Sequence, residues 1–504
     1  MKRKLCFIIA LCFMLTGCQK TPDESAVVSK ADGLREDVIA EPLAESEKVT
    51  LDVPSRWEME DKRSNDRVTI SAELDLGTME AGNLPVIEKS NHELSQQELE
   101  DLVSYFSKDQ KLYVPNVNTK EVYQYVIDRI ENQEGSYANT FMASSYRELK
   151  DAVTKAKELA PETNEEPELA EVKFQKPAED PAKAASEDWS GGRKPDADSE
   201  AEDYFAADVG SEREAHIEAE RYDSKLENSS RFVWRNGAAP LLLGDIQQTI
   251  DNWNYAGIGG YAEKITGLYD QYQACLEQSD RISEEDGKTQ AKQLLEDLGI
   301  SNMEVSSIEP GLWVPYCMGY KVREIGFGED YYWQVDLEQA VSGYQYTFSS
   351  YINEIPAKRT YGTVSEQTTE SYIPPFPVET ITIDVTKDGV QSFKWEGMTE
   401  EVKTIAENTN LLPFEKVQNQ LADQIFYWYA QMGQPANDTT QFEYKVTDAE
   451  LLYTYVPAYG EPKDAWLVPA WAFTVGYTSN GEGTPWKNWF VINALDGGVI
   501  GRAD

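Results

Sequence analysis

Hydrophobic and polar residues alternate along several stretches of this 504-residue chain at the spacing that strands and helices require. In residues 67–76 (RVTISAELDL) every second residue is apolar, which predicts a strand with one buried face. Ser95 and Glu98 form a capping-box pattern, and the apolar residues that follow at helical spacing predict a helix. Two further helical patterns come next. This order predicts a small α+β domain over residues 49–160.

The second half of the chain repeats one order of elements: a helix, several strands, and then a strand, Asp-Gly and another strand. Residues 383–393 (IDVTKDGVQSF) and residues 491–501 (VINALDGGVIG) both fit the last part of this order. Glycine adopts positive φ without Cβ strain, so an Asp-Gly pair between two apolar runs predicts a tight hairpin. We therefore expect α+β modules, each with a small antiparallel sheet packed against one or more helices. Whether the two copies are a true duplication stays open.

The run from Trp489 to Ile500 (WFVINALDGGVI) predicts the last of these hairpins, because the strand resumes directly after the turn. Strand alternation places Phe490 and Ile492 on one face. An isolated two-stranded ribbon is only marginally stable. We expect this face to pack against the preceding helix, the one that carries Leu421.

Composition divides the chain into parts. Residues 161–201 contain recurrent proline with Glu, Asp, Ala and Lys, and few large apolar residues. Such a segment buries too little surface to offset its ordering entropy, which predicts a flexible linker. The predicted parts are a signal peptide (1–17), a lipidated flexible tether (18–48), an N-terminal α+β domain (49–160), an acidic proline-rich linker (161–201), a middle α+β module (202–400) and a C-terminal module (401–504).

The N-terminal residues indicate export. Basic residues 2–4 precede an apolar run, Leu5–Leu15, which is too short to cross a membrane comfortably. Leu15-Thr16-Gly17-Cys18 follows in register and resembles the lipobox of bacterial lipoproteins. That resemblance implies a lipid on Cys18 and a location on the extracytoplasmic face of the cell membrane. The alternative is an ordinary signal peptide with a chance cysteine.

Charge and cysteine content narrow the partners. The formal net charge of −43 argues against nucleic acid and against anionic lipid as partners. Beyond Cys18, the exported part contains Cys275 and Cys317. They could form one extracellular disulfide, but two cysteines make no framework, so their pairing stays open.

The closing strands carry a family resemblance. Leu467-Val-Pro-Ala-Trp471, then a strand, then Val491-Ile-Asn-Ala-Leu-Asp-Gly497 resemble the end of PepSY-type and YycI-type extracytoplasmic modules. The resemblance covers roughly residues 410–504, with a weaker echo at 283–397, and implies a helix packed on an antiparallel sheet. The whole chain is similar to an uncharacterised family of Gram-positive surface lipoproteins. The matching residues are Pro469, Trp471, Asn493, Ala494 and Gly497.

No stretch carries a recognisable catalytic motif. The chain has two histidines, His92 and His216, and neither stands in a zinc-binding or nucleophile-activating pattern. Asp384 begins a run that imitates a calcium loop, but Trp395 stands where that loop needs glutamate, so a strand and turn are expected. We expect no enzyme activity, metal or cofactor.

Aromatic residues offer the remaining candidate contacts. Trp471 shares a strand face with other large apolar residues, which favours a place in the core. Trp486 and Trp489 flank a turn and are the candidates for ligand contact. The sequence therefore predicts a lipid-anchored, non-catalytic surface protein that binds a protein or peptide, with a regulatory role as one option. The alternative is a cell-wall or carbohydrate-binding or carbohydrate-active protein that uses exposed Trp, Tyr and carboxylates.

Overall fold

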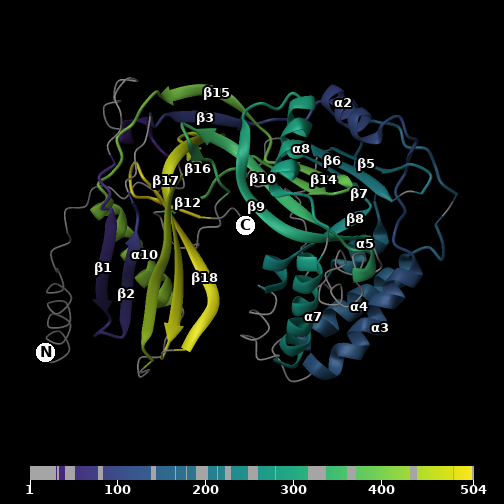
Figure 1. The fold of residues 1–504 in the computed structure, drawn as a ribbon, viewed down its shortest axis with the longest axis horizontal. Helices are drawn as coiled ribbons and strands as arrows, with labels where there is room; N and C mark the ends of the chain where they lie inside the picture. The colour runs from purple at the N-terminus through teal and green to yellow at the C-terminus, as the bar shows by residue number, and fades with distance from the viewer. Residues whose placement is uncertain are drawn as a thin grey trace, which may run out of the picture.

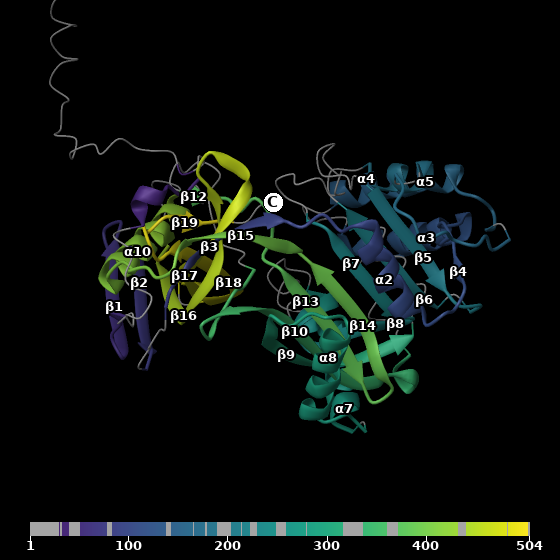
Figure 2. The same cartoon turned by 90° about the horizontal axis from the view of Figure 1, so that it is seen from above.

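The computed structural model shows an α+β protein built on two β-sheets that lie side by side (Figures 1 and 2). The predicted α+β class is confirmed, but the sheets are larger than predicted, and the first contains parallel as well as antiparallel pairs. The residues described are 30, 33–39, 51–77, 83–137, 143–164, 166–176, 179–188, 203–212, 214–221, 229–247, 259–278, 280–315, 336–359, 371–431, 440–480 and 482–501.

The first sheet combines strands from both ends of the chain. β2 pairs in parallel with β16, with Val68 opposite Phe442, and β3 pairs with both β15 and β17. The path through the sheet is β1-β2-β16-β17-β18-β19-β12. Its strands are β1 (Arg56–Arg63), β2 (Val68–Asp75), β3 (Val86–Asn91), β12 (Ser371–Tyr372), β15 (Thr399–Ala406), β16 (Phe442–Ala458), β17 (Glu461–Ser479), β18 (Glu482–Asn493) and β19 (Val499–Ile500).

The second sheet is formed by the middle of the chain, in the order β4-β5-β6-β7-β14-β13-β10-β9-β8, with β11 paired to β10. Its strands are β4 (Leu112–Tyr113), β5 (Asp203–Val209), β6 (Ala215–Arg221), β7 (Arg231–Asn236), β8 (Ala238–Leu242), β9 (Met303–Pro315), β10 (Val341–Ile352), β11 (Ile355–Pro356), β13 (Thr380–Thr386) and β14 (Gly389–Glu396).

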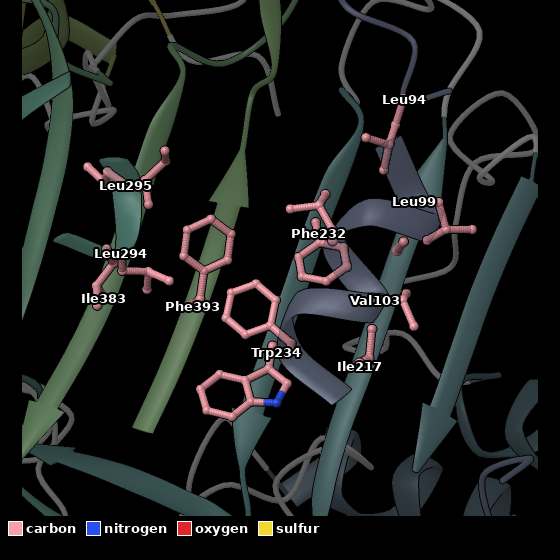
Figure 3. Close-up of a cluster of buried hydrophobic side chains, with 14 of the residues drawn as sticks. Leu94, Leu99, Val103, Ile217, Phe232, Trp234, Leu294, Leu295, Ile383 and Phe393 are labelled. Carbon is pink, nitrogen blue, oxygen red and sulfur yellow. The ribbon is translucent and has the colours of Figure 1, made fainter. Parts of the chain in front are cut away.

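Two helices cover one face of the second sheet, α2 (Gln96–Ser107) and α8 (Glu284–Asp297). The predicted capping box is present, because Ser95 accepts from the Glu98 backbone N–H and Glu98 accepts in return. In Figure 3 the rings of Phe232, Trp234 and Phe393 project from neighbouring strands toward α2. This apolar face is the largest core among the residues described.

The remaining helices form smaller contacts around the two sheets. α3 (Lys120–Tyr137), α4 (Ala143–Leu159) and α5 (Pro181–Ser186) pack on one another, and α7 (Gly259–Gln278) packs against β9. α10 (Phe414–Gln431) lies against the first sheet. Two short 3-10 helices are η2 (Glu36–Val38) and η4 (Leu337–Gln339).

Two of the predicted domains, residues 49–160 and residues 202–400, are not separate units. Residues 49–160 do not form one unit, because β1 to β3 belong to the first sheet while α2 packs on the second. The strand β12, although within residues 202–400, pairs with β19 of the C-terminal part. Hydrophobic periodicity detected the elements, but pairing between distant segments decided how they assemble.

The segment predicted as a flexible linker packs on the protein wherever it is described, up to residue 188. Phe174 is buried in the core of the second sheet, and Gln175 exchanges backbone hydrogen bonds with Tyr204 of β5. Ala182 of α5 is buried against α4. Small and isolated apolar residues fill gaps here, which composition alone did not indicate. The rest of the predicted linker lies outside the described residues.

The predicted tether is also partly wrong, because Lys30 and residues 33–39 pack on the first sheet. We call these residues the strap. Leu34 is fully buried and forms a parallel bridge with Ala458.

The predicted C-terminal hairpin is confirmed. β18 pairs antiparallel with β19, and Phe490 and Ile492 share a core with Leu421 of α10. Gly497 adopts a φ of +76°, and its N–H donates to the Asn493 carbonyl. The hairpin does not close the sheet, because β12 pairs in parallel with the outer side of β19.

A buried polar group lies where the two sheets meet. Glu379 is 8% exposed and accepts from Trp395 Nε1 at 2.8 Å and from Thr399 Oγ1 at 3.3 Å. Thr399 Oγ1 also lies 3.3 Å from the Tyr455 hydroxyl of the first sheet. Burial raises the pKa of Glu379, and hydrogen bonds from Trp395 and Thr399 oppose the rise. This carboxyl group therefore links residues of both sheets.

Candidate functional site

The residues singled out in the sequence lie apart. Cys18 and Cys317 are outside the described residues, as is the side chain of Trp486. Cys275 is half-buried and forms no disulfide with any cysteine that the structure describes. Trp489 is 45% exposed, whereas the three residues after it are buried. Of the two tryptophans predicted to contact a ligand, Trp489 is the one whose side chain is described, and its indole is exposed.

Trp466 and Trp471 belong to the core, as the sequence predicted for Trp471. Trp471 is 1% exposed, lies edge-on to Phe414 and stacks on Phe473. Among the residues of the PepSY-like motif, the Ala494 N–H donates to the Pro469 carbonyl at 3.0 Å. These contacts join the closing strands, so the motif residues have structural roles here.

Asp384 occupies a strand rather than a metal loop. Its carboxylate accepts from Ser392 Oγ at 2.6 Å and from Gln345 Nε2 at 3.0 Å, and it is 2% exposed. Burial raises its pKa despite these hydrogen bonds. The expected strand and turn are confirmed, since β13 and β14 form a hairpin around residues 387–388.

A row of polar side chains crosses the second sheet on the face opposite α2 and α8. Each member pairs with the next across neighbouring strands, and the adjacent row, which includes Ile217 and Ile383, lies in the core. The polar row contains, in order, Asp208, His216, Arg235, Ser392, Asp384, Gln345 and Glu309. With strands about 4.8 Å apart, seven strands give a row about 29 Å long.

The accessible part of the polar row is the end that contains His216 and Arg235. His216 Nδ1 lies 3.0 Å from Asp208 Oδ1, and the His216 side chain is 29% exposed. Arg235 is exposed and forms no ion pair with another described residue. Toward Asp384 the row is buried, so an incoming group would meet the imidazole and the guanidinium first.

Charged residues surround this end of the row. Arg231 donates to Glu218 and to Glu220, each at 2.7 Å. Burial raises the pKa of Glu218, but the positive charges of Arg231, His216 and Arg235 outweigh burial, so its pKa lies below the usual value. Glu218 is therefore ionised at neutral pH. The face offers both signs of charge, which suits a polar ligand with its own donors and acceptors.

His92 has a different role. Its Nε2 lies 2.8 Å from Glu98 Oε1, and Glu98 is the carboxylate of the α2 capping box. This contact joins the end of β3 to the start of α2, which is a structural function. Within the described residues no group of His, Cys, Asp and Glu is arranged to hold a metal ion. No described helix is long and apolar enough to cross a membrane.

The sequence carried a partial signal for the polar row. In residues 215–221 (AHIEAER) polar residues alternate with apolar ones, which is the pattern of a strand with one polar face, whereas residues 203–209 and 231–236 each contain at least three consecutive apolar residues. His216 by itself stands in no catalytic pattern. The register that places it between Asp208 and Arg235 depends on which strands pair, and periodicity does not give that.

Comparisons with known proteins place few constraints on the chain. No protein-family model matches it, and no curated protein matches it. Among solved structures, it is similar to the crystal structure of an uncharacterized protein from Eubacterium rectale, at 10% sequence identity and a TM-score of 0.42. The match covers 92% of this chain and 97% of the other. A likeness of this size supports no conclusion about function.

Proposed function

We propose that the protein is a lipid-anchored, extracytoplasmic binding protein whose partner is a polar peptide or protein segment. The anchor is proposed from the lipobox pattern ending at Cys18, and the PepSY-like closing motif agrees with an extracytoplasmic module. The observation that carries the binding role is the polar row, with exposed Arg235 beside the His216–Asp208 pair.

A partner that covers this face must supply hydrogen bonds of its own. The charged side chains of the face lose their hydrogen bonds to water when they are covered, and the partner has to replace them. A peptide can do so, because its backbone and side chains offer donors and acceptors along an extended line. The accessible part of the row, from Asp208 to Arg235, covers three strands or about 10 Å, which corresponds to roughly three extended residues at 3.3–3.4 Å each.

The binding role is tested with an array of synthetic peptides probed with labelled protein. Arg235→Ala should lower binding to the peptides that the wild type selects by about tenfold, because a charge-assisted hydrogen bond contributes about 1.5–3 kcal/mol. Arg56→Ala is the matched control, since Arg56 is 61% exposed and lies on β1 of the first sheet. Equal binding by both variants would contradict the assignment of the site.

The carbohydrate alternative is tested in parallel on a glycan array. Exposed Trp489, like exposed Tyr427 and Tyr459, is able to stack on a sugar ring. Glycan binding that Trp489→Ala abolishes and Arg235→Ala leaves intact would replace the peptide proposal with the carbohydrate one.

The anchor has its own test. Cys18→Ala should prevent incorporation of a palmitate analogue and release the protein from the membrane fraction. If the variant still labels and still sediments with membranes, Cys18 is not the attachment site.

A further inference from the structure

The strap is held by the backbone of the first sheet. The Leu34 N–H donates to the Pro457 carbonyl at 2.8 Å, and the Tyr459 N–H donates to the Leu34 carbonyl at 3.2 Å. The Leu34 side chain is fully buried in a core with Val456 and Ala458. The strap therefore docks on the turn between β16 and β17 as an additional extended segment.

Two side-chain features make this docking specific. Gly33 has a φ of +94°, and a Cβ there would lie 2.7 Å from the Ala458 carbonyl carbon, so only glycine fits. Lys30 forms an ion pair with Asp496, whose side chain is 12% exposed. The Tyr372 hydroxyl donates to the same carboxylate at 2.8 Å, and Lys30 Nζ lies 5.1 Å from the Tyr372 ring centroid. These contacts clasp the start of the strap to β12 and to the β18–β19 turn.

Docking shortens the distance that the chain can span from the proposed anchor. From Cys18 to Lys30 there are twelve residues, which reach at most about 40 Å when fully extended. Without the strap, the next described segment begins at Leu51, and the same calculation gives about 110 Å. We infer that the strap holds the first sheet against the membrane, with the surface around the β16–β17 turn facing the lipid headgroups. The inference rests on the lipid anchor proposed above.

That surface combines exposed apolar and aromatic side chains with charges of both signs, including Glu36, Glu461 and the Arg35–Asp37 ion pair. Tyr459, beside the strap, is 49% exposed. Ile373 is 52% exposed and follows Tyr372, whose hydroxyl bonds to Asp496. The Arg35 guanidinium lies 5.4 Å from the Tyr459 ring centroid. Tyrosine is favoured at membrane interfaces, because one end of its side chain is apolar and the other forms hydrogen bonds.

The test measures energy transfer from a single donor dye to acceptor-labelled lipid in vesicles that carry the full lipidated chain. The dye is placed by Glu461→Cys, an exposed position beside the β16–β17 turn, with Cys275 and Cys317 replaced by serine. Leu34→Ser should undock the strap and lower the transfer efficiency several-fold. Glu36→Ser is the matched control, because Glu36 is an exposed residue of the same strap and its replacement should leave transfer unchanged.

A second variant separates undocking from loss of folding. Twenty Gly/Ser residues inserted between Cys18 and Lys30 leave every strap contact in place but extend the maximal reach to roughly 110 Å. This variant should also lower transfer, with an unchanged melting temperature. Unchanged transfer in either Leu34→Ser or the insertion variant would overturn the inference. Failure of the wild-type chain to incorporate a palmitate analogue would instead overturn the proposed anchor, so the two failures are distinguishable.

Discussion

Replacing Ile492 with alanine should destabilise the first sheet substantially. Ile492 is 0% exposed on β18, and it lies in one core with Leu421 and Ile425 of α10. Truncation of a buried isoleucine to alanine removes its burial and leaves a cavity, at a cost of about 2–5 kcal/mol. The surrounding side chains include Trp57 and Trp471, which are large and closely packed. Because such a core relaxes little, we expect the upper half of that range.

Urea unfolding followed by tryptophan fluorescence measures this effect, because Trp57 and Trp471 report on the same core. The midpoint should fall while the slope stays constant, since the surface exposed on unfolding hardly changes. Trp489→Ala is the control on the same strand: its side chain is 45% exposed, so we expect a change within about 0.5 kcal/mol. If Ile492→Ala keeps the wild-type midpoint but loses peptide binding, the hairpin is a recognition element and the packing argument fails.

Three further outcomes are expected. Between the usual glutamate pKa and the raised pKa of folded Glu379, the folded state binds the extra proton, so stability falls as pH rises. Glu379→Gln, which keeps the acceptor for Trp395, should therefore be more stable than the wild type at neutral pH, and the difference should vanish below about pH 4 in thermal melts. Gly343→Ala should lower the free energy of unfolding by about 1–3 kcal/mol, because the new Cβ would lie 2.2 Å from the Val385 carbonyl oxygen. Gly476→Ala is the control, because a Cβ there meets open space; equal melting temperatures of the two variants would contradict the argument. Limited trypsin digestion should spare residues 166–176 and 179–188, because Phe174 packs on the second sheet and α5 packs on α4; early mass-spectrometric fragments ending at Lys183 would count against the packing.

The sequence predicted local features well and assembly poorly. The α2 capping box can be predicted from sequence because each of Ser95 and Glu98 accepts a hydrogen bond from the backbone N–H of the other, within one turn. The hairpin at Gly497 can also be predicted from local sequence, because its turn needs a residue with positive φ and glycine adopts one easily. By contrast, nothing near Val68 indicates that its partner is Phe442. Contacts between segments so far apart depend on the complete fold, and they moved the domain boundaries.

The candidate site shows the same limit. Alternation in β6 indicated a polar face, but the row depends on the register of seven strands. The strap was missed because one buried leucine and one glycine in a polar segment carry no periodic signal. The predicted lipid anchor, the peptide or glycan partner and the PepSY likeness remain predictions.

The pairing of β2 with β16 also constrains how the chain reaches its native state. Strands β1 to β3 leave the ribosome early, yet their neighbours β16 and β17 are synthesised last. Contacts of such long sequence separation must close a large loop before they contribute stability, and folds rich in them form slowly. The first sheet consequently cannot assemble until nearly the whole chain has emerged. Strands β1 to β3 therefore lack their sheet partners until β16 and β17 have been synthesised.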